Sequence, residues 1–164
     1  MKIAFFFGSM KRGGAERVIA SLANTFCAQG DEVHIITKDN GASEYPLDER
    51  VRHVRRGLAG KSANKLQGLM RNVKLIRALR RQVKAGGYDA VVTMRKRGTI
   101  LLQYAFLFGR RFRLIASERA NPRMERYGRL EQLQYDLLLP RVDGFIFQTE
   151  RVSHCFSERL RRIG

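Results

Sequence analysis

The chain has 164 residues, which fits one domain of ordinary size, and 44% of them are hydrophobic, which is enough to bury a core. This composition excludes a disordered or fibrous protein. Lys and Arg number 32 against 15 Asp and Glu, so the net charge is +17, and residues 50–84 hold 12 of these basic residues and no acidic one. A positive field so concentrated implies an anionic partner such as nucleic acid, a phosphorylated ligand or a membrane.

The first 37 residues follow the pattern strand, helix, strand. Lys2–Phe7 is a short apolar run that ends at Gly8 and indicates a buried strand. Between residues 15 and 26, apolar side chains recur at spacings of three and four, which indicates one face of a helix that ends near Gly30. Glu32–Thr37 follows as a second strand. We therefore expect a right-handed βαβ unit with parallel strands.

The basic region of the chain contains a short strand and a long helix. Val51–Val54 fits a third strand, and Asn64–Lys84 fits a helix that Gly86 and Gly87 end. The helix carries one apolar stripe, which consists of Leu66, Leu69, Met70, Val73, Ile76, Leu79 and Val83. We expect this stripe to pack on the sheet and the cations of the helix to face outward.

The rest of the chain alternates between strands and helices. The expected strands are Tyr88–Thr93, Arg113–Ser117 and Gly144–Gln148, and the expected helices are Thr99–Phe108, Leu130–Leu139 and Glu150–Arg162. This alternation predicts an α/β fold with a doubly wound, Rossmann-like parallel sheet of six or seven strands and helices on both faces. Ligands bind such sheets at the carboxyl ends of the strands, so the loops that follow strands are the candidate site.

Several classes of protein and site are excluded by what the sequence lacks. The two cysteines and three histidines are scattered and provide neither a disulfide framework nor a metal-binding spacing. There is no Asp-x-Asp pair to hold a metal with a nucleotide diphosphate, and no cofactor is implied. No apolar run reaches the ~18 residues that span a bilayer, and Met1–Gly8 is too short for a signal peptide. We therefore expect a cytoplasmic protein.

The loop after the first strand, Gly8–Arg17 (GSMKRGGAER), has the composition of a phosphate-binding loop. Gly13 and Gly14 precede the first helix, so backbone N–H groups and the positive end of the helix dipole face the crevice. The loop lacks the G-x-G-x-x-G spacing of dinucleotide binders and the G-K-[ST] ending of a P-loop. A plain tight turn is therefore the alternative. Glu16, in the first helical turn, complements the dipole and is expected to be structural.

Three segments resemble glycosyltransferase family four, whose members are retaining enzymes of the GT-B fold. The first is the opening strand followed by G-x-x-x-x-GGAERV. Leu114–Arg123 (LIASERANPR) is similar to a segment of a bacterial branch that acts on lipid-linked saccharides, and Gly144–Phe156 (GFIFQTERVSHCF) is similar to the segment that closes the same half of the family's fold. Together the three segments span nearly the whole chain.

The resemblance implies two Rossmann-like domains with the active site between them. The first half receives the acceptor, and the second holds the nucleotide-sugar. Residues 1–164 would then be the N-terminal, acceptor-side domain without the nucleotide-sugar-binding domain, and this chain alone would transfer no sugar. The implied activity of the whole enzyme is transfer of a hexosyl group from a nucleotide-sugar to a saccharide or polyprenyl-diphosphate-linked acceptor. The enzyme would take part in cell-surface polysaccharide assembly, and it would lie on the inner face of the cell membrane.

At the carboxyl edge, the resemblance implies roles for the glycines and for Glu118 and Arg119, and the chemistry of the cations indicates the others. Gly13 and Gly14 would approach the donor diphosphate. Acceptor-binding candidates share a position in loops that follow strands: Lys11, Arg12, Arg95, Lys96, Glu118 and Arg119. Arg95 and Lys96, with Arg97, would grip an acceptor pyrophosphate, or else form a solvated basic loop. Glu118 is a candidate catalytic base, and the resemblance implies that many relatives carry a His there instead. A retaining enzyme needs no protein base if the departing phosphate takes the proton.

The long basic helix is the candidate membrane contact. Its cations, which include Arg71, Lys74, Arg77, Arg80, Arg81 and Lys84, have no acid among them. Like charges on one helix repel, so an external anion is expected to compensate them, and an anionic leaflet would do so. The alternative is a solvated helix of a generally basic protein.

Two other functions are compatible with the sequence. A nucleic-acid-binding domain would use the +17 charge through phosphate contacts, but no RRM, KH or zinc signature is present, and no aromatic residue is interleaved with the basic run. We therefore expect no specific nucleic-acid partner. A free-standing Rossmann-like binding module is the second alternative, and it would need a complete site within 164 residues.

Overall fold

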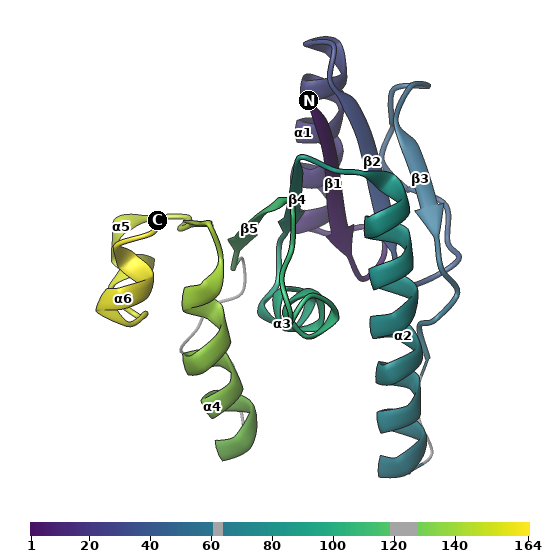
Figure 1. Ribbon diagram of the computed structural model, residues 1–164. Coiled ribbons are helices and arrows are strands. Elements are labelled where there is room, and N and C mark those ends of the chain that lie inside the picture. The colour runs from purple at the N-terminus through teal and green to yellow at the C-terminus, as the bar shows by residue number, and fades with distance from the viewer. Residues whose placement is uncertain (61–63, 119–127) are drawn as a thin grey trace.

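A computed structural model of the chain describes residues 1–60, 64–118 and 128–164. Its centre is a parallel sheet with the strand order β3-β2-β1-β4-β5-β6 (Figure 1). The strands are β1 (Lys2–Phe7), β2 (Glu32–Thr37), β3 (Arg52–Arg55), β4 (Ala90–Thr93), β5 (Arg113–Ser117) and β6 (Gly144–Ile146). The helices are α1 (Gly14–Ala28), α2 (Lys65–Gly86), α3 (Lys96–Ala105), α4 (Arg129–Leu138), the 3-10 turn η1 (Leu139–Arg141), α5 (Glu150–Ser153) and α6 (Glu158–Arg161).

The topology confirms the predicted doubly wound α/β fold. β1 pairs in parallel with β2 on one side, with Lys2 opposite Glu32, and with β4 on the other, with Ile3 opposite Ala90. The chain therefore winds outward from β1 in one direction and then returns past β1 to wind in the other. The point where the order reverses lies between β1 and β4, and open parallel sheets bind ligands at the carboxyl ends of the strands at such a point.

The central strands supply two separate cores because successive side chains point to opposite faces of the sheet. Phe5 packs with Ile19 and Cys27 of α1 on one face. Phe6 packs on the other face in the core that α2, α3 and α4 share, with residues such as Leu79 of α2. Figure 1 shows α1 behind the sheet and α2 and α3 in front of it. The predicted cover of helices on both faces is confirmed.

Only half of the predicted apolar stripe of α2 packs on the protein. Asn64 caps the start of α2, because its side chain accepts a hydrogen bond from the amide of Gln67. Gly87, whose φ of 59° lies in the left-handed region, caps its end. Leu79 and Val83 are buried as expected, together with Leu75, which the stripe did not include. The expectation was wrong for the first half of the stripe, where the exposed side chains are Leu66, Leu69, Met70 and Val73.

The reason is the length of α2 compared with that of the sheet. Figure 1 shows the N-terminal half of α2 running past the carboxyl ends of the strands, and α4 does the same on the other side of α3. No sheet surface faces those turns, so their apolar side chains stay uncovered. The carboxyl edge of the sheet is therefore flanked by two projecting helices.

Three element boundaries differ from the sequence-based predictions. α3 spans Lys96–Ala105 instead of Thr99–Phe108. It starts earlier because only Met94 and Arg95 separate it from β4. The single helix predicted for Glu150–Arg162 is two short ones, α5 and α6, with the chain extended at Ser157 between them. Phe156 interrupts the helix because its ring packs on Phe145 of β6, with ring centroids 5.3 Å apart. The six strands all lie within two residues of their predicted bounds.

No helix among the described residues has both the length and the apolar character needed to cross a membrane.

Candidate functional site

The loops at the carboxyl ends of the strands contain most of the candidate residues. Because all the strands are parallel, the loops after β1, β2, β4 and β5 open on the same edge. The loop after β1 carries Gly13 and Gly14, and the start of α3 after β4 carries Arg95 and Lys96. Glu118 follows β5 directly. Arg119 and the rest of the Leu114–Arg123 segment, residues 120–123, lie outside the described residues.

Gly13 and Gly14 stand at the start of α1 in different surroundings. The amide of Gly13 donates to the hydroxyl of Tyr45 across 2.9 Å, and a Cβ on Gly13 would lie within 2.1 Å of a carboxylate oxygen of Glu16. A Cβ on Gly14 would meet no atom within 4 Å. The carboxylate of Glu16 thus lies over the beginning of α1, where a negative charge interacts favourably with the helix dipole. Gly14 is the glycine of the pair that faces open space.

Lys11 and Arg12 are exposed on the outside of the same loop. The guanidinium of Arg12 lies 3.4 Å from the carboxylate of Glu44, and its side chain is 89% exposed. An exposed pair of this kind contributes little to stability and leaves both side chains able to rearrange.

The start of α3 is organised around Glu118 and Lys96. The carboxylate of Glu118, which is only 3% exposed, accepts a hydrogen bond from the backbone amide of Lys96 across 2.9 Å. It therefore provides the α3 N-terminus with an acceptor that Arg95, the residue at the N-cap position, does not supply. The negative charge also lies at the positive end of the α3 dipole.

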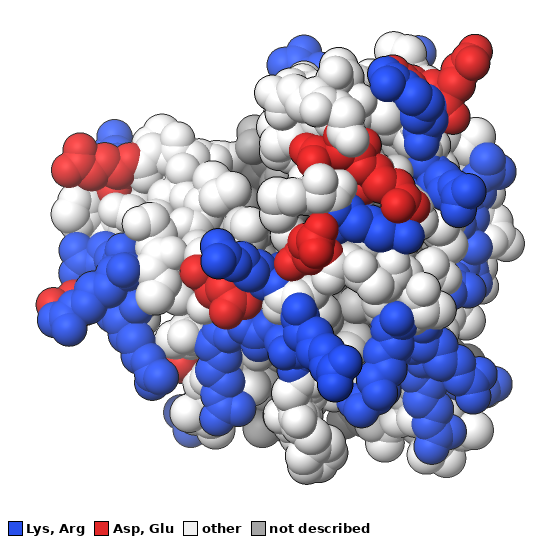
Figure 2. All heavy atoms as spheres, turned by 45° about the horizontal axis from the view of Figure 1, so that its top comes forward, with Lys and Arg blue, Asp and Glu red and all other residues white. Residues whose placement is uncertain are grey.

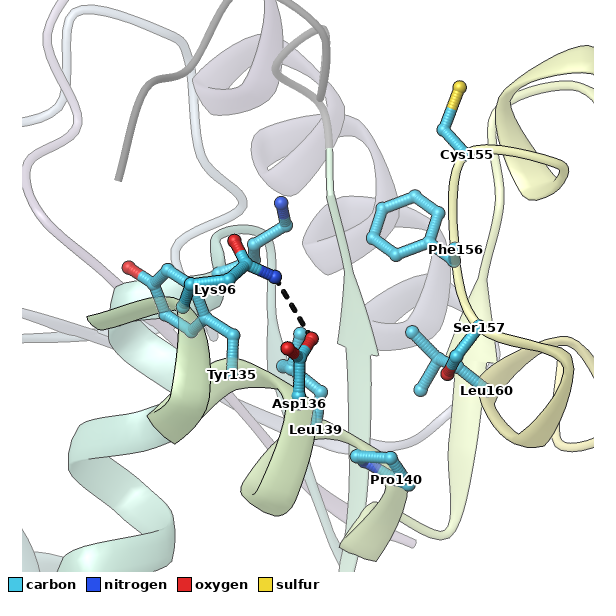
Figure 3. A pocket seen from close by; sticks show the side chains of 10 residues that line it. Lys96, Tyr135, Asp136, Leu139, Pro140, Cys155, Phe156, Ser157 and Leu160 are labelled. Carbon is cyan, nitrogen blue, oxygen red and sulfur yellow. Dashed lines mark hydrogen bonds between the residues drawn. The ribbon is translucent and has the colours of Figure 1, made fainter. Parts of the chain in front are cut away.

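The side chain of Lys96 is buried between aromatic rings rather than solvated. Its ammonium lies 5.7 Å from the ring centroid of Tyr135 on α4 and 5.1 Å from that of Phe156. Figure 3 shows the three side chains around a small pocket of about 140 Å³, which Cys155 and Leu160 also line. Such contacts are typical of cation–π interactions. The basic triplet Arg95, Lys96 and Arg97 is therefore not one solvated cluster, because its middle member points inward.

Arg95 and Arg97 point outward from the same turn. Both are exposed, and the guanidinium of Arg97 lies 3.0 Å from the carboxylate of Glu131 on α4. The hydroxyl of Tyr135 donates to the same carboxylate across 2.9 Å. Burial and then this hydrogen bond raise the pKa of Tyr135 above its usual range, so Tyr135 stays a hydrogen-bond donor.

Lys38, which the sequence analysis did not single out, belongs to this edge. It follows β2 directly, and its Cε lies 3.8 Å from where a Cβ on Gly8 would be. Burial, and then the charges of Arg97, Arg95 and Arg71, lower the pKa of Lys38 below its ordinary value. Among the described residues, no carboxylate lies within salt-bridge distance of Lys38. The rule that ligands bind after strands would have identified Lys38 if it had been applied to the second strand.

A second, larger cavity of about 760 Å³ extends from this edge between α2, α3 and α4. Lys38, Arg71 and Arg97 line it together with apolar side chains of α2 and α3. We call this cavity the α2–α3 groove. Some of the apolar side chains of α2 that sequence reasoning placed against the sheet, such as Leu69 and Val73, line this groove instead.

The six cations proposed as membrane-facing are of two kinds. Arg71 donates to the carbonyl of Gly60, and Arg80 donates to the carbonyl of Ala105 across 2.6 Å and lies over the ring of Phe106. The other four are exposed along α2: Lys74, Arg77, Arg81 and Lys84. Figure 2 shows Lys and Arg side chains as a broad band across the lower half of one face, with most Asp and Glu above it.

No group of His, Cys, Asp and Glu that could hold a metal ion occurs in the described part of the chain. The described part of the candidate site consists of glycines, cations and one carboxylate, that of Glu118, which caps α3. Such a set can bind anions and sugar hydroxyls.

Comparisons with known proteins agree with this architecture. A family model described as Glycosyltransferase Family 4 matches residues 12–162. No curated protein matches the sequence. The lipopolysaccharide outer core galactosyltransferase WaaB, in its apo form, is 16% identical, and the match covers 97% of this chain and 42% of that chain with a TM-score of 0.70.

Two further solved structures are similar. Sucrose-phosphate synthase from Thermosynechococcus elongatus is 12% identical over 88% of this chain and 41% of that chain, with a TM-score of 0.66. Anabaena HepE in complex with UDP and glucose is 17% identical over 97% of this chain and 41% of that chain, with a TM-score of 0.64. The chain thus spans about two-fifths of the length of these proteins. At such identities the likeness shows the fold, which is that of one half of a GT-B glycosyltransferase.

Proposed function

We propose, from the premise that this chain belongs to glycosyltransferase family 4, that it forms the acceptor-binding half of a retaining glycosyltransferase. The whole enzyme would move a hexosyl group from a nucleotide-sugar to a saccharide acceptor carried on a lipid diphosphate, in cell-surface polysaccharide assembly. The observation that carries the proposal is the family match over residues 12–162, in a chain that corresponds to two-fifths of its structural neighbours. The nucleotide-sugar would be held by a domain that corresponds to the part of those neighbours outside the match.

The donor diphosphate would approach the start of α1 at Gly14. The open space above Gly14 supports this position, because a phosphate could come close to the backbone without meeting a side chain. The amide of Gly13 already donates to Tyr45, so Gly13 would position the turn rather than bind the phosphate directly.

The acceptor would be bound by the exposed cations of this edge, Lys11, Arg12 and Arg95. The buried position of Lys96 supports a positioning role for it, and the cap that Glu118 gives to α3 supports the same for Glu118. The proton of the attacking hydroxyl would then pass to the departing phosphate, which suits a retaining enzyme. Arg119 remains a candidate for the acceptor sugar by resemblance alone.

The exposed cations of α2 would hold the domain on the anionic inner face of the cell membrane. Lys74, Arg77, Arg81 and Lys84 support this proposal because they are exposed on one helix without an acidic neighbour in its sequence. Each cation near an anionic surface contributes ~1 kcal/mol. Membrane attachment would bring the carboxyl edge to a lipid-linked acceptor.

Titration of the purified chain with nucleotide-sugars tests whether this domain binds the acceptor and not the donor. We expect no binding of UDP- or GDP-sugars tighter than roughly millimolar, and no sugar transfer. Inorganic pyrophosphate, which mimics the acceptor's diphosphate, should bind at the carboxyl edge. Turnover of any nucleotide-sugar by the purified chain would overturn the proposal.

A further inference from the structure

The α2–α3 groove has an apolar wall and a cationic end. On α3, Arg97 is followed by Ile100, Leu101 and Tyr104 at spacings of three, four and seven residues, so the four side chains share one face of the helix. Arg97 lies in the first turn, at the carboxyl edge of the sheet, and Tyr104 lies about 10 Å farther along the helix axis. The groove is therefore charged where it opens on the candidate site and apolar beyond it.

α2 provides the opposite wall. Leu69, Val73 and Ile76 repeat at spacings of four and three and line the groove, and Arg71 lines it as well. Leu69 is 61% exposed and Val73 is 38% exposed. These side chains are apolar and uncovered in a helix that is otherwise strongly basic. A concave apolar surface suits a chain lying within it better than it suits a flat bilayer.

The charged end has an excess of positive charge. Lys38 is half-buried, and the positive charges of Arg97, Arg95 and Arg71 act on it. Of these four cations, Arg97 lies 3.0 Å from the carboxylate of Glu131, and Lys38 has no carboxylate within salt-bridge distance in the described part of the chain. A phosphate or diphosphate group at this end would interact favourably with all of them.

We propose that the α2–α3 groove binds a single amphiphile, a prenyl-type phosphate, with its hydrocarbon chain between α2 and α3 and its phosphate at Lys38, Arg71 and Arg97. The inference rests on the proposed function and deepens it, because it assigns separate positions to the chain and the head group of a lipid-linked acceptor. The saccharide would then lie at the carboxyl edge, next to Gly8 and Lys38.

Calorimetry with two water-soluble probes tests the groove. Farnesyl diphosphate carries both an apolar chain and a diphosphate, and inorganic pyrophosphate carries the head group alone. We expect farnesyl diphosphate to bind at least about tenfold more tightly, because its chain leaves water. The chain has no Trp, so Tyr104→Trp places a single indole in the groove. Its emission should shift to the blue with farnesyl diphosphate and not with pyrophosphate.

Two pairs of variants separate the apolar wall from the charged end. Val73→Asp should remove most of the farnesyl advantage and change pyrophosphate binding less than about twofold, whereas Met70→Asp, on the same helix but outside the groove lining, should leave both affinities near the parent's. Lys38→Gln should weaken both probes by a similar factor of about ten, and the control Arg111→Gln should not. Circular dichroism confirms that each variant is folded.

The outcomes distinguish this inference from the proposed function. Equal affinity for the two probes, or equal losses in Val73→Asp and Met70→Asp, overturns the groove as the chain-binding site and leaves acceptor binding at the carboxyl edge intact. If neither probe binds the chain, the proposed acceptor function is contradicted as well. Farnesyl binding that resists Lys38→Gln would contradict the assignment of the head group.

Discussion

The carboxylate of Glu118 accepts a hydrogen bond from the backbone amide of Lys96 across 2.9 Å, and it thereby joins the end of β5 to the start of α3. A carboxylate that directly follows a neighbouring strand thus takes the place of a local N-cap side chain. Because both groups are buried, loss of the carboxylate would leave the amide without this acceptor. The interaction explains why α3 starts as soon as β4 ends.

Glu118→Ala should therefore lower the free energy of unfolding by about 1–3 kcal/mol, the usual effect of leaving a buried donor unpaired. Glu118→Gln retains a carbonyl oxygen at the same distance and should lower it less. Urea unfolding followed by circular dichroism gives both values. Equal losses in the two variants would show that the charge, and not the hydrogen bond, is what α3 requires.

The two glycines at the start of α1 should respond differently to alanine. Gly14→Ala meets no atom within 4 Å and should leave stability unchanged or raise it by up to about 1 kcal/mol. Gly13→Ala displaces the carboxylate of Glu16 and should cost about 0.3–1 kcal/mol, the size of a lost charge–dipole interaction.

A double-mutant cycle checks this explanation. In a Glu16→Ala background, Gly13→Ala should have little further effect, because the carboxylate that it displaces is already gone. Thermal and urea unfolding of the four proteins provide the comparison. If Gly13→Ala costs the same in both backgrounds, the effect comes from the backbone and not from Glu16.

Acid should destabilise the protein through His34. Its Nε2 lies 3.1 Å from the carboxylate of Glu32 and its Nδ1 lies 2.6 Å from the hydroxyl of Tyr88. Burial, partly opposed by Glu32, lowers the pKa of His34 below its ordinary 6.5. The unfolded chain then takes up a proton before the folded one does, so stability is complete above about pH 6.5 and falls as the pH drops toward the folded pKa.

His34→Asn should reduce this pH dependence. Asn does not titrate and keeps an acceptor that can reach Tyr88, so the free energy of unfolding should vary less between pH 7 and pH 5 than in the parent. His154→Asn, at an exposed position, is the matched control. A parent-like slope in His34→Asn would mean that other groups, such as the half-buried His53, dominate the acid response.

Membrane attachment should depend on the four exposed cations of α2. We expect co-sedimentation with vesicles to require anionic lipid, to weaken with salt, and to fall at least about tenfold when Lys74, Arg77, Arg81 and Lys84 are changed to Gln. Arg80 is left intact because it bonds to Ala105, and its loss would disturb the packing of α2 on α3.

A second quadruple variant with the same change in charge is the control. It replaces four exposed arginines toward the β6 end of the sheet: Arg111, Arg141, Arg151 and Arg159. It should bind vesicles almost as well as the parent. If both variants lose binding equally, net charge and not the face of α2 determines attachment.

The order of strands and helices could be predicted from the sequence because buried strands are short apolar runs and the helices between them have a regular spacing. The exposure of Leu69 and Val73 could not be predicted in this way. Their stripe continues smoothly into Leu79 and Val83, and only the length of the sheet determines where it loses its cover.

The candidate site was predictable only in part. The carboxyl-edge rule located the loops that contain Gly14 and Glu118, but it does not tell which way a side chain points. Lys96 is one of three adjacent cations in the sequence, and its burial depends on Tyr135 and Phe156, which are 39 and 60 residues away. The break in the last helix has the same origin, because Phe156 packs on Phe145 of a strand.

The central position of β1 has a consequence for synthesis on the ribosome. Its first partner, β2, follows within 37 residues, but its other edge pairs with β4, which starts at Ala90. At about 5–20 residues per second, several seconds pass between the emergence of the two partners. During that time an edge of a very apolar strand is open to pairing with other nascent chains. The segment that emerges in this interval, residues 50–84, holds 12 basic residues and no acidic one, so two such nascent chains repel each other.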